Sequence, residues 1–86
     1  MKIAYSKDFI KQFKNLRKNE RVRVSRAIAL FVEQPNAPQL RNHQLKGRLA
    51  QYHSISAGGD IRIHYKVYQS KMLILFVEVD SHSWLY

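Results

Sequence analysis

The hydrophobic periodicity of this chain changes at Pro35 and Pro38, and that change constrains the fold more than any other feature. Before the two prolines, apolar residues recur every three to four positions, as they do on one face of an α-helix. After them no long helical period returns, and short segments alternate between apolar and polar residues, as strands do. We therefore expect helices followed by a strand meander, which is an α+β arrangement.

The N-terminal half predicts one short strand and two helices. Residues 2–5 are expected to form the strand, after which Ser6 can cap the first helix. Asn19 can cap the second helix, and the two prolines end it. The apolar faces consist of Phe9, Phe13 and Leu16 in the first helix and of Val24, Ala27, Ile28 and Phe31 in the second.

The C-terminal half predicts three strands, at residues 49–56, 60–67 and 72–80, with Gly58-Gly59 as a turn between the first two. The element order is then β-α-α-β-β-β within a single domain over residues 1–86. Two helices before a meander should pack on one face of a small, mostly antiparallel sheet and leave the other face open. The polar side of the middle strand should lie on that open face, with Asp60, Arg62, His64 and Lys66 in a row.

The chain carries a strong positive charge for its size. Fifteen Lys and Arg residues face six Asp and Glu residues among 86, which gives a formal net charge of +9. This excess costs folding stability through self-repulsion, so a small domain that carries it usually has a negatively charged partner. RNA is the expected partner, and a merely solvated cationic surface is the alternative. The row of polar residues on the open face suits a phosphate backbone, although a solvated sheet face has the same pattern.

Composition disfavours several other classes of protein. Without cysteine the chain has no disulfide scaffold and no thiolate zinc site. Its histidines form no metal-binding motif, so no metal and no cofactor is expected. The longest apolar run, Met72–Val77, is far shorter than the ~20 residues of a membrane helix, and the N-terminus lacks the apolar region of a signal peptide. We expect a cytoplasmic protein with no membrane partner.

Three segments together resemble the toxins of the RelE/ParE superfamily of bacterial toxin–antitoxin modules, and most of all their YafQ-like branch. YafQ-like toxins end in a Gly-Thr-His-Ser-x-Leu-Tyr/Phe pattern with a catalytic histidine, so the C-terminal segment is the most specific. The sequence departs from the pattern at Asp80, where the branch has glycine, and at Ser56, where it often has a second histidine. The three segments are His43-Gln44-Leu45-Lys46-Gly47, Asp60-Ile61-Arg62-Ile63-His64-Tyr65-Lys66 and Asp80-Ser81-His82-Ser83-Trp84-Leu85-Tyr86.

The resemblance implies a RelE-like fold and a ribosome-dependent mRNA endonuclease, or mRNA interferase. In that chemistry the ribose 2′-OH attacks the adjacent phosphate without a metal, with His82 as the acid and either Asp60 or His43 as the base. A cognate acidic antitoxin, the ribosome and mRNA are the implied partners. The implied catalytic residues are His82, Asp60, Arg62, His43 and Tyr86, and the residues expected to contact RNA are Lys46, Arg48, His64, Lys66, Lys11, Lys14 and Lys18.

Three alternatives remain open at the level of sequence. ParE-like members of the same superfamily poison DNA gyrase and have no nuclease site, so they would need neither His82 nor Asp60. A pure RNA-binding module would use its histidines and tyrosines only as contacts. A degenerate toxin would only bind an antitoxin. The histidine-containing C-terminal segment argues against the gyrase inhibitor, and cleavage of ribosome-bound message would separate the RNA-binding module from the endonuclease.

Overall fold

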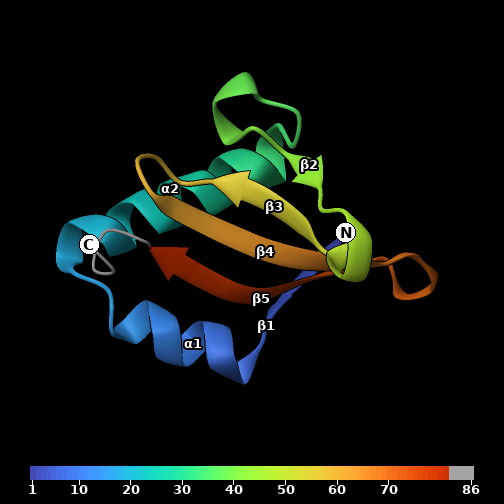
Figure 1. Ribbon diagram of the computed structural model, residues 1–86, viewed down its shortest axis with the longest axis horizontal. Helices are drawn as coiled ribbons and strands as arrows, with labels where there is room; N and C mark the ends of the chain where they lie inside the picture. Colours follow the sequence, from blue (N-terminus) through green and yellow to red (C-terminus); the bar gives the residue numbers. More distant parts are fainter. Residues whose placement is uncertain (82–86) are drawn as a thin grey trace.

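A computed structural model of the chain describes residues 1–81, which form a five-stranded sheet and two helices (Figure 1). The strand order in the sheet is β1-β5-β4-β3-β2; β1 is parallel to β5, and every other neighbouring pair is antiparallel. The α+β class and the mostly antiparallel sheet are thus confirmed. The elements are β1 (Lys2–Tyr5), α1 (Lys7–Lys14), α2 (Lys18–Glu33), β2 (His43–Gln44), β3 (His53–Ser56), β4 (Ile61–Tyr68) and β5 (Leu73–Ser81).

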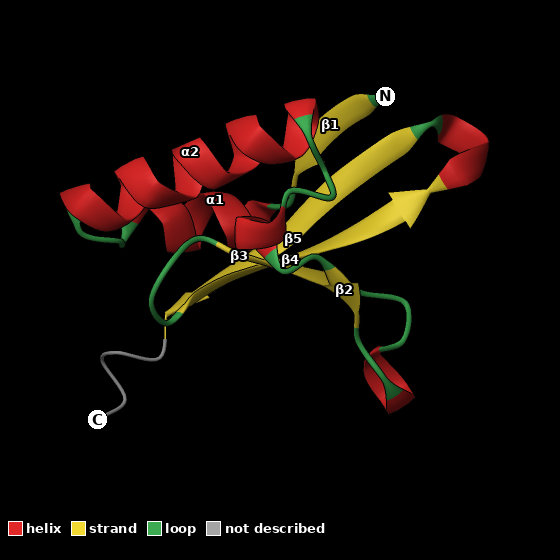
Figure 2. Cartoon of the chain, turned by 90° about the horizontal axis from the view of Figure 1, so that it is seen from above, coloured by secondary structure: helices red, strands yellow, loops and turns green. Residues whose placement is uncertain are grey.

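Both helices lie on one side of the sheet, and the loop that follows β2 projects from the other side (Figure 2). The predicted alternation along β4 explains which face of the sheet the helices cover. Its apolar residues Ile61, Ile63 and Tyr65 are all buried beneath the helices. They join Phe76 of β5 and Val24 of α2, each with no exposed surface, in one core. Aromatic pairs complete this core, including Phe31 against Tyr65 and Phe76.

Helix α1 packs along β5 where β1 has ended. The hydroxyl of Ser6 accepts a hydrogen bond from the Phe9 backbone amide at 3.0 Å, as predicted for the helix cap, and donates one to the carbonyl of Val77 at 2.6 Å. The side chain of Gln12 then accepts a bond from the Val79 amide at 2.9 Å. These side chains pair the backbone groups of β5 that no strand reaches, so they cover what would otherwise be an open sheet edge.

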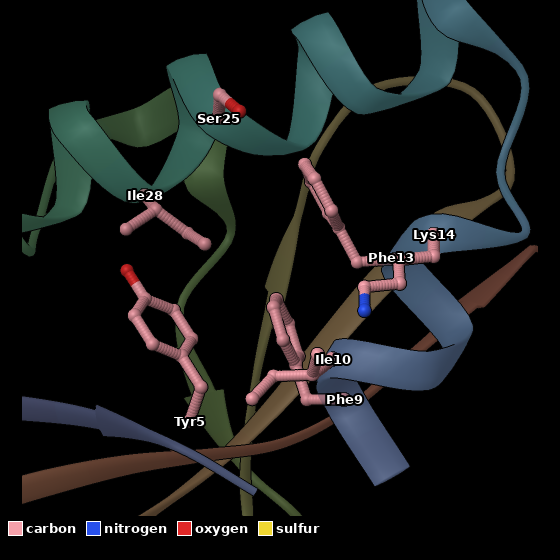
Figure 3. Close-up of a pocket in the computed structure, with 7 residues that line it drawn as sticks. All are labelled: Tyr5, Phe9, Ile10, Phe13, Lys14, Ser25 and Ile28. Atoms are coloured by element: carbon pink, nitrogen blue, oxygen red, sulfur yellow. The ribbon is translucent and has the colours of Figure 1, made fainter. Parts of the chain in front are cut away.

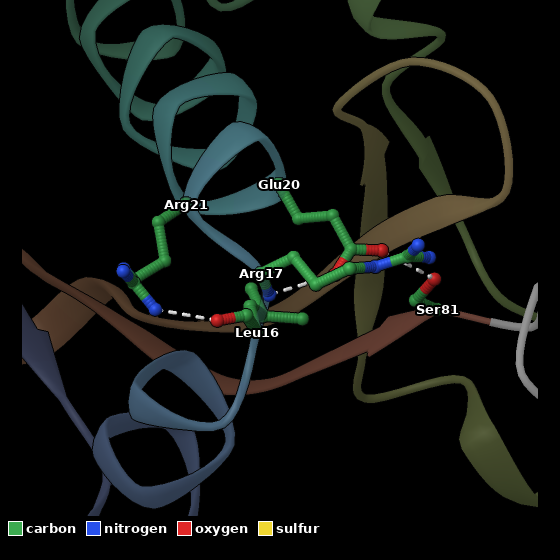
Figure 4. Close-up of polar contacts among 5 residues, drawn as sticks. All are labelled: Leu16, Arg17, Glu20, Arg21 and Ser81. Carbon is green, nitrogen blue, oxygen red and sulfur yellow. Dashed lines mark hydrogen bonds and ion pairs between the residues drawn. The ribbon is translucent and has the colours of Figure 1, made fainter.

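Helix α2 begins earlier than predicted, because its N-cap is Arg17 and not Asn19. The carboxylate of Glu20 reaches back to accept a hydrogen bond from the Arg17 backbone amide at 2.9 Å, which is half of a capping box (Figure 4). The same carboxylate accepts a bond from the hydroxyl of Ser81 at 3.3 Å. Glu20 is buried, and the bond from the Arg17 amide lowers the pKa of its carboxyl group. One carboxylate therefore ties the start of α2 to the end of β5.

The strand expected over residues 49–56 is shorter than predicted. Residues Gly47–Leu49 form a single 3₁₀ turn, and β3 begins only at His53. The segment closes on itself through a bond from the Leu45 amide to the Tyr52 carbonyl at 2.9 Å, and Gly47 has a φ of 67° that favours glycine. The two-residue strand β2, which pairs with β3, was not predicted.

The predicted Gly58-Gly59 turn is confirmed, with φ values of 95° and 53°. Asp60 was expected to be the first residue of the next strand, but it lies in the turn, and β4 starts at Ile61. The register between β4 and β5 shifts between His64 and Tyr65, so that Val77 has no direct partner on β4. This bulge locally bends β5 beneath the open face.

Candidate nucleic-acid interface on the open sheet face

The register of the sheet arranges the polar side chains of the open face in two rows. Directly paired residues lie about 5 Å apart on the same face of a sheet. One row runs across four strands, with His43, Ser54, His64 and Glu78 as successive partners. The other row joins Ser56, Arg62 and Asp80. Two of the four polar residues predicted on the middle strand, Arg62 and His64, therefore meet partners that the sequence alone did not identify.

The guanidinium of Arg62 is held against the turn that precedes its own strand. Its Nη1 donates to the hydroxyl of Ser56 at 3.3 Å and to the carbonyls of Gly59 and Ile61 at 2.9 and 3.0 Å. A hollow of about 430 Å³ lies beside it, and Arg41 lines the same hollow from the loop before β2. Two guanidinium groups facing one hollow offer a site for a phosphate group.

His64 and Glu78 form a close pair at the centre of this face. Nδ1 of His64 lies 2.8 Å from Oε1 of Glu78, and the two side chains are 21% and 47% exposed. His64 lines a second hollow of about 220 Å³, whose other residues are Asp8, Leu45, Leu49, Tyr52, Val77 and Glu78. Glu78 and Asp8 were not predicted as site residues. Strict two-residue alternation along β5 would place Glu78 on the same face as the buried Phe76. The bulge at Val77 moves Glu78 to the open face, where the register pairs it with His64.

An aromatic side chain forms part of the wall of the same hollow. Nζ of Lys66 lies 4.9 Å from the centre of the Tyr52 ring, which is a cation–π contact. Tyr52 comes from the loop that projects on this side of the sheet, and the same loop carries the exposed Lys46 and Arg48. A ring beside cationic side chains is an arrangement on which a nucleic-acid base can stack. Tyr52 was not predicted as a site residue, because the sequence placed it within the strand expected at residues 49–56, whereas β3 begins only at His53.

His43 lies on the short strand β2, exposed at the end of the four-residue row. Its Nδ1 contacts the carbonyl of Arg41 at 2.8 Å. The preceding residue, Asn42, accepts a hydrogen bond from the buried hydroxyl of Tyr65 at 2.7 Å and donates one to the Pro35 carbonyl at 3.0 Å. Burial raises the pKa of Tyr65, which therefore remains a donor at neutral pH. The core thus holds the loop that presents His43.

The structure does not gather every predicted site residue. The side chain of Asp60 is exposed in its turn and makes no hydrogen bond with residues 1–81. The predicted lysine stripe is divided, because α1 ends at Lys14 and Lys18 begins α2. Lys11 is exposed one turn beyond Asp8. The predictions for His82 and Tyr86 fall outside the described residues.

An apolar groove lies between the two helices, away from the polar rows. It measures about 480 Å³, and Figure 3 shows aromatic side chains from β1 and α1 facing Ile28 of α2. Tyr5 and Ile10 on its border are 44% and 45% exposed. Such a surface suits a protein partner better than a polyanion. The lining residues are Tyr5, Phe9, Ile10, Phe13, Lys14, Ser25 and Ile28.

Metal and membrane features were also sought in the described part of the chain. Residues 1–81 contain no group of three or more His, Cys, Asp or Glu side chains placed to hold a metal ion. Within the same residues no helix combines the length and the apolar character needed to cross a bilayer.

No protein-family model and no curated protein sequence matches the chain. Solved structures do match it over nearly its whole length. The YoeB/ParE toxin from Agrobacterium tumefaciens has a TM-score of 0.77 at 19% identity, covering 95% of this chain and 99% of that one. YafQ from Escherichia coli has a TM-score of 0.77 at 20% identity, with 98% and 96% covered. The E. coli DinJ–YafQ complex has a TM-score of 0.75 at 22% identity, again with 98% and 96% covered.

The two helices on one face of a β1-β5-β4-β3-β2 sheet are the fold of RelE/ParE-superfamily toxins. Among these toxins the likeness includes YafQ itself, both alone and in complex with DinJ. The fold implied by the resemblance in the sequence is confirmed.

Proposed function

We propose that this protein is the toxin of a toxin–antitoxin module and acts as a ribosome-dependent mRNA endonuclease. The observation that carries this proposal is the open sheet face, where the guanidinium of Arg62 borders a hollow and His64 lies two residues further along the same strand. The similarity of the fold to YafQ and to the YoeB/ParE toxin supports the toxin role. The net charge of +9 supports a polyanionic substrate.

The proposed reaction is metal-independent cleavage of RNA by its own ribose. The 2′-oxygen attacks the neighbouring phosphorus, and the products are a cyclic phosphate and a free 5′-hydroxyl. The reaction needs a base for the 2′-hydroxyl, an acid for the leaving 5′-oxygen and cations for the negatively charged transition state. Arg62, assisted by Lys46, is the proposed cation. His82 is the proposed acid, Tyr86 completes the proposed site, and Asp60 or His43 is the base that the resemblance implies.

The remaining cationic side chains are proposed to hold the RNA rather than to react with it. Tyr52 lines the central hollow with Lys66 against its ring, and a base can stack beside them. Arg48 extends the cationic surface on the loop before β3. Lys11, Lys14 and Lys18 are proposed to contact the ribosome, since phosphate contacts position a complex without reading its sequence.

We propose that an acidic antitoxin occupies the apolar groove between α1 and α2. The DinJ–YafQ complex, whose toxin chain matches this one, is described as a toxin–antitoxin complex. The groove combines exposed apolar side chains with Lys14 on its border, so it suits an apolar segment of a negatively charged partner. An antitoxin is therefore the occupant to which the proposal commits.

Induced expression tests the proposed function in cells. Induction without the antitoxin should stop growth and truncate translated messages within their coding regions, and co-expression of the antitoxin should restore both. Intact messages from cells that contain folded, soluble protein would reject the endonuclease. Growth arrest with intact messages and with inhibited DNA supercoiling would instead indicate a gyrase inhibitor.

A further inference from the structure

The pair formed by His64 and Glu78 fixes the hydrogen atoms of one imidazole ring. A carboxylate can only accept a hydrogen bond, so the 2.8 Å contact requires that Nδ1 of His64 carries the hydrogen. In the neutral ring, Nε2 then has a free lone pair that can accept a proton. Nε2 makes no hydrogen bond with any residue of the described range 1–81. This is the arrangement in which a carboxylate orients a histidine for proton transfer.

The position of His64 gives that lone pair access to a ligand. His64 lines the central hollow of about 220 Å³, and its side chain is 21% exposed, so the ring is held by its surroundings yet reached by solvent. Arg62 lies two residues earlier on the same face of β4, which is a separation of about 6.5–7 Å along the strand.

We propose that His64 is the catalytic base of this site and that Glu78 positions it. This inference rests on the proposed function and deepens it, since it assigns the proton acceptor to a residue that the family resemblance does not select. Asp60 is less suited, because it lies exposed in the turn before β4 without a side-chain partner in residues 1–81. His43 lies on an edge strand of two residues, two strand spacings from His64.

The step balances with groups already named. The 2′-oxygen forms a bond to phosphorus while its proton moves to Nε2 of His64. The bond between phosphorus and the 5′-oxygen breaks, its electron pair leaves with that oxygen, and the 5′-oxygen takes a proton from the general acid. His64 later returns its proton to water, and the acid regains one from water. Arg62 offsets the charge that accumulates on the phosphate oxygens.

The proton transfer takes place among several other charged or titratable groups. They are Glu78 on β5, Asp8 on α1, Tyr52 on the loop before β3, Arg62 and Lys66 on β4 itself, and His43 in the same row across the sheet. Only Glu78 among these contacts the imidazole of His64 through a hydrogen bond. The variants below therefore include His43 as a rival base.

The test is single-turnover cleavage of one mRNA on programmed ribosomes, with saturating protein, between about pH 5.5 and 8.5. Saturation separates the chemical step from binding. The rate of the parent protein should rise with pH on the acidic side of its profile, because the base must be unprotonated, and fall again where the general acid loses its proton. His64→Gln should lower the saturated rate about 10²–10⁴-fold and remove that rise. Glu78→Gln should lower it by up to about 10⁴-fold, as when an amide replaces the carboxylate that orients a catalytic histidine, and should keep the rise.

His53→Gln is the matched control, because His53 lies on the opposite face of β3, where its ring stacks on Tyr65 with 5.0 Å between centres. It should cleave at the parent rate and with the parent pH dependence. Thermal unfolding checks that each variant is folded, and Glu78→Gln, which leaves the imidazole in place, decides the question should His64→Gln fail to fold.

Two results overturn the proposal in different ways. If the parent cleaves and His64→Gln cleaves at the same saturated rate, or if His43→Gln is the variant that removes the pH dependence, His64 is not the base while the endonuclease stands. If the parent cleaves no message under any condition, the endonuclease and its base are both rejected.

Discussion

Arg62 is the residue whose observed contacts bear most directly on the proposed chemistry. Its Nη1 donates three hydrogen bonds to the β3–β4 turn, while the rest of the guanidinium borders the hollow shared with Arg41. A guanidinium has five donors, so holding the turn leaves others for a phosphate. The bond to Ser56 is of particular interest, because Ser56 occupies the position where YafQ-like toxins often have a second histidine. Here that position supports the arginine.

Replacing Arg62 with alanine should affect both activity and stability. Cleavage should fall about 10²–10³-fold, the scale of losing one electrostatic stabiliser of the transition state. The lost hydrogen bonds to the turn should also cost about 1 kcal/mol, which lowers the melting temperature by about 4–8 °C in a domain of this size. Single-turnover cleavage and thermal unfolding measure the two effects.

Arg26→Ala is the control for this change, since Arg26 is exposed on α2 and makes no hydrogen bond in residues 1–81. Arg26→Ala should change neither the cleavage rate nor the melting temperature. Normal cleavage by a folded Arg62→Ala protein would remove Arg62 from the reaction and leave it as a structural residue of the turn.

At the scale of elements, the start of α2 depends on one buried carboxylate. The pKa of Glu20 is lowered chiefly by the bond from the Arg17 amide, and the Arg17 guanidinium and Ser81 hydroxyl act in the same direction while burial opposes them. A lowered pKa in the folded state means that the ionised form stabilises the fold. This contribution is complete at neutral pH and is lost as pH falls through and below the ordinary carboxyl range of about 4.3.

Glu20→Gln should therefore destabilise the protein by about 0.5–1 kcal/mol at pH 7, the usual worth of a negative charge at a helix N-terminus. The melting temperatures of parent and variant should converge as the pH falls below the lowered pKa of the parent carboxyl. Glu33→Gln, at the exposed C-terminal end of α2, should show no such convergence. A constant difference between parent and Glu20→Gln at every pH would mean that charge is irrelevant to this cap.

These elements also show which parts of the fold the sequence patterns could predict. The alternation at residues 60–67 and the glycine pair before it predicted β4 and its turn, because period and turn chemistry are local properties. The cap of α2 was misplaced because Asn19 is a good local cap, whereas the choice of Arg17 depends on Glu20 and its distant partner Ser81. Strand β2 has two residues and no period of its own, so only its pairing with β3 defines it.

Part of the candidate site could likewise be predicted from the sequence, and part of it could not. Arg62, His64 and Lys66 were correctly predicted to share one face, since alternate residues of a strand do so. The pairing of His64 with Glu78 depends on the register of two strands and on the bulge near it, and no single segment of sequence encodes that register. Tyr52 reaches the site through a loop closed by the Leu45 amide, which is likewise a tertiary contact.

The apolar groove between α1 and α2 gives a prediction for the antitoxin. Ile10 is 45% exposed on the border of the groove, so Ile10→Glu should leave the fold intact while placing a charge in the contact. Affinity for the cognate antitoxin should fall about 10–100-fold in calorimetric titration, as expected for losing an apolar anchor. Val32→Glu is the matched control, because Val32 is 57% exposed on α2 outside the groove. Equal binding by both variants would place the antitoxin elsewhere.

The whole molecule separates two kinds of surface on one small sheet. Helices cover one face and present the apolar groove, whereas the other face presents cationic and titratable side chains beside two hollows. A net charge of +9 favours a polyanionic partner, and the proposed antitoxin would occupy a separate place, the groove. This separation would let an antitoxin bind without first displacing RNA from the open face.

The most direct test of the account is the chemistry of the RNA ends left by the purified protein on ribosomes programmed with a defined message. We predict cuts within the coding region, with a 2′,3′-cyclic phosphate on the upstream fragment and a 5′-hydroxyl on the downstream fragment. His82→Gln should lower this cleavage about 10²–10⁴-fold while ribosome binding is retained. Messages that stay intact on ribosomes bound by the folded protein, or fragments with 5′-phosphate ends, would contradict the proposed attack by the ribose 2′-hydroxyl.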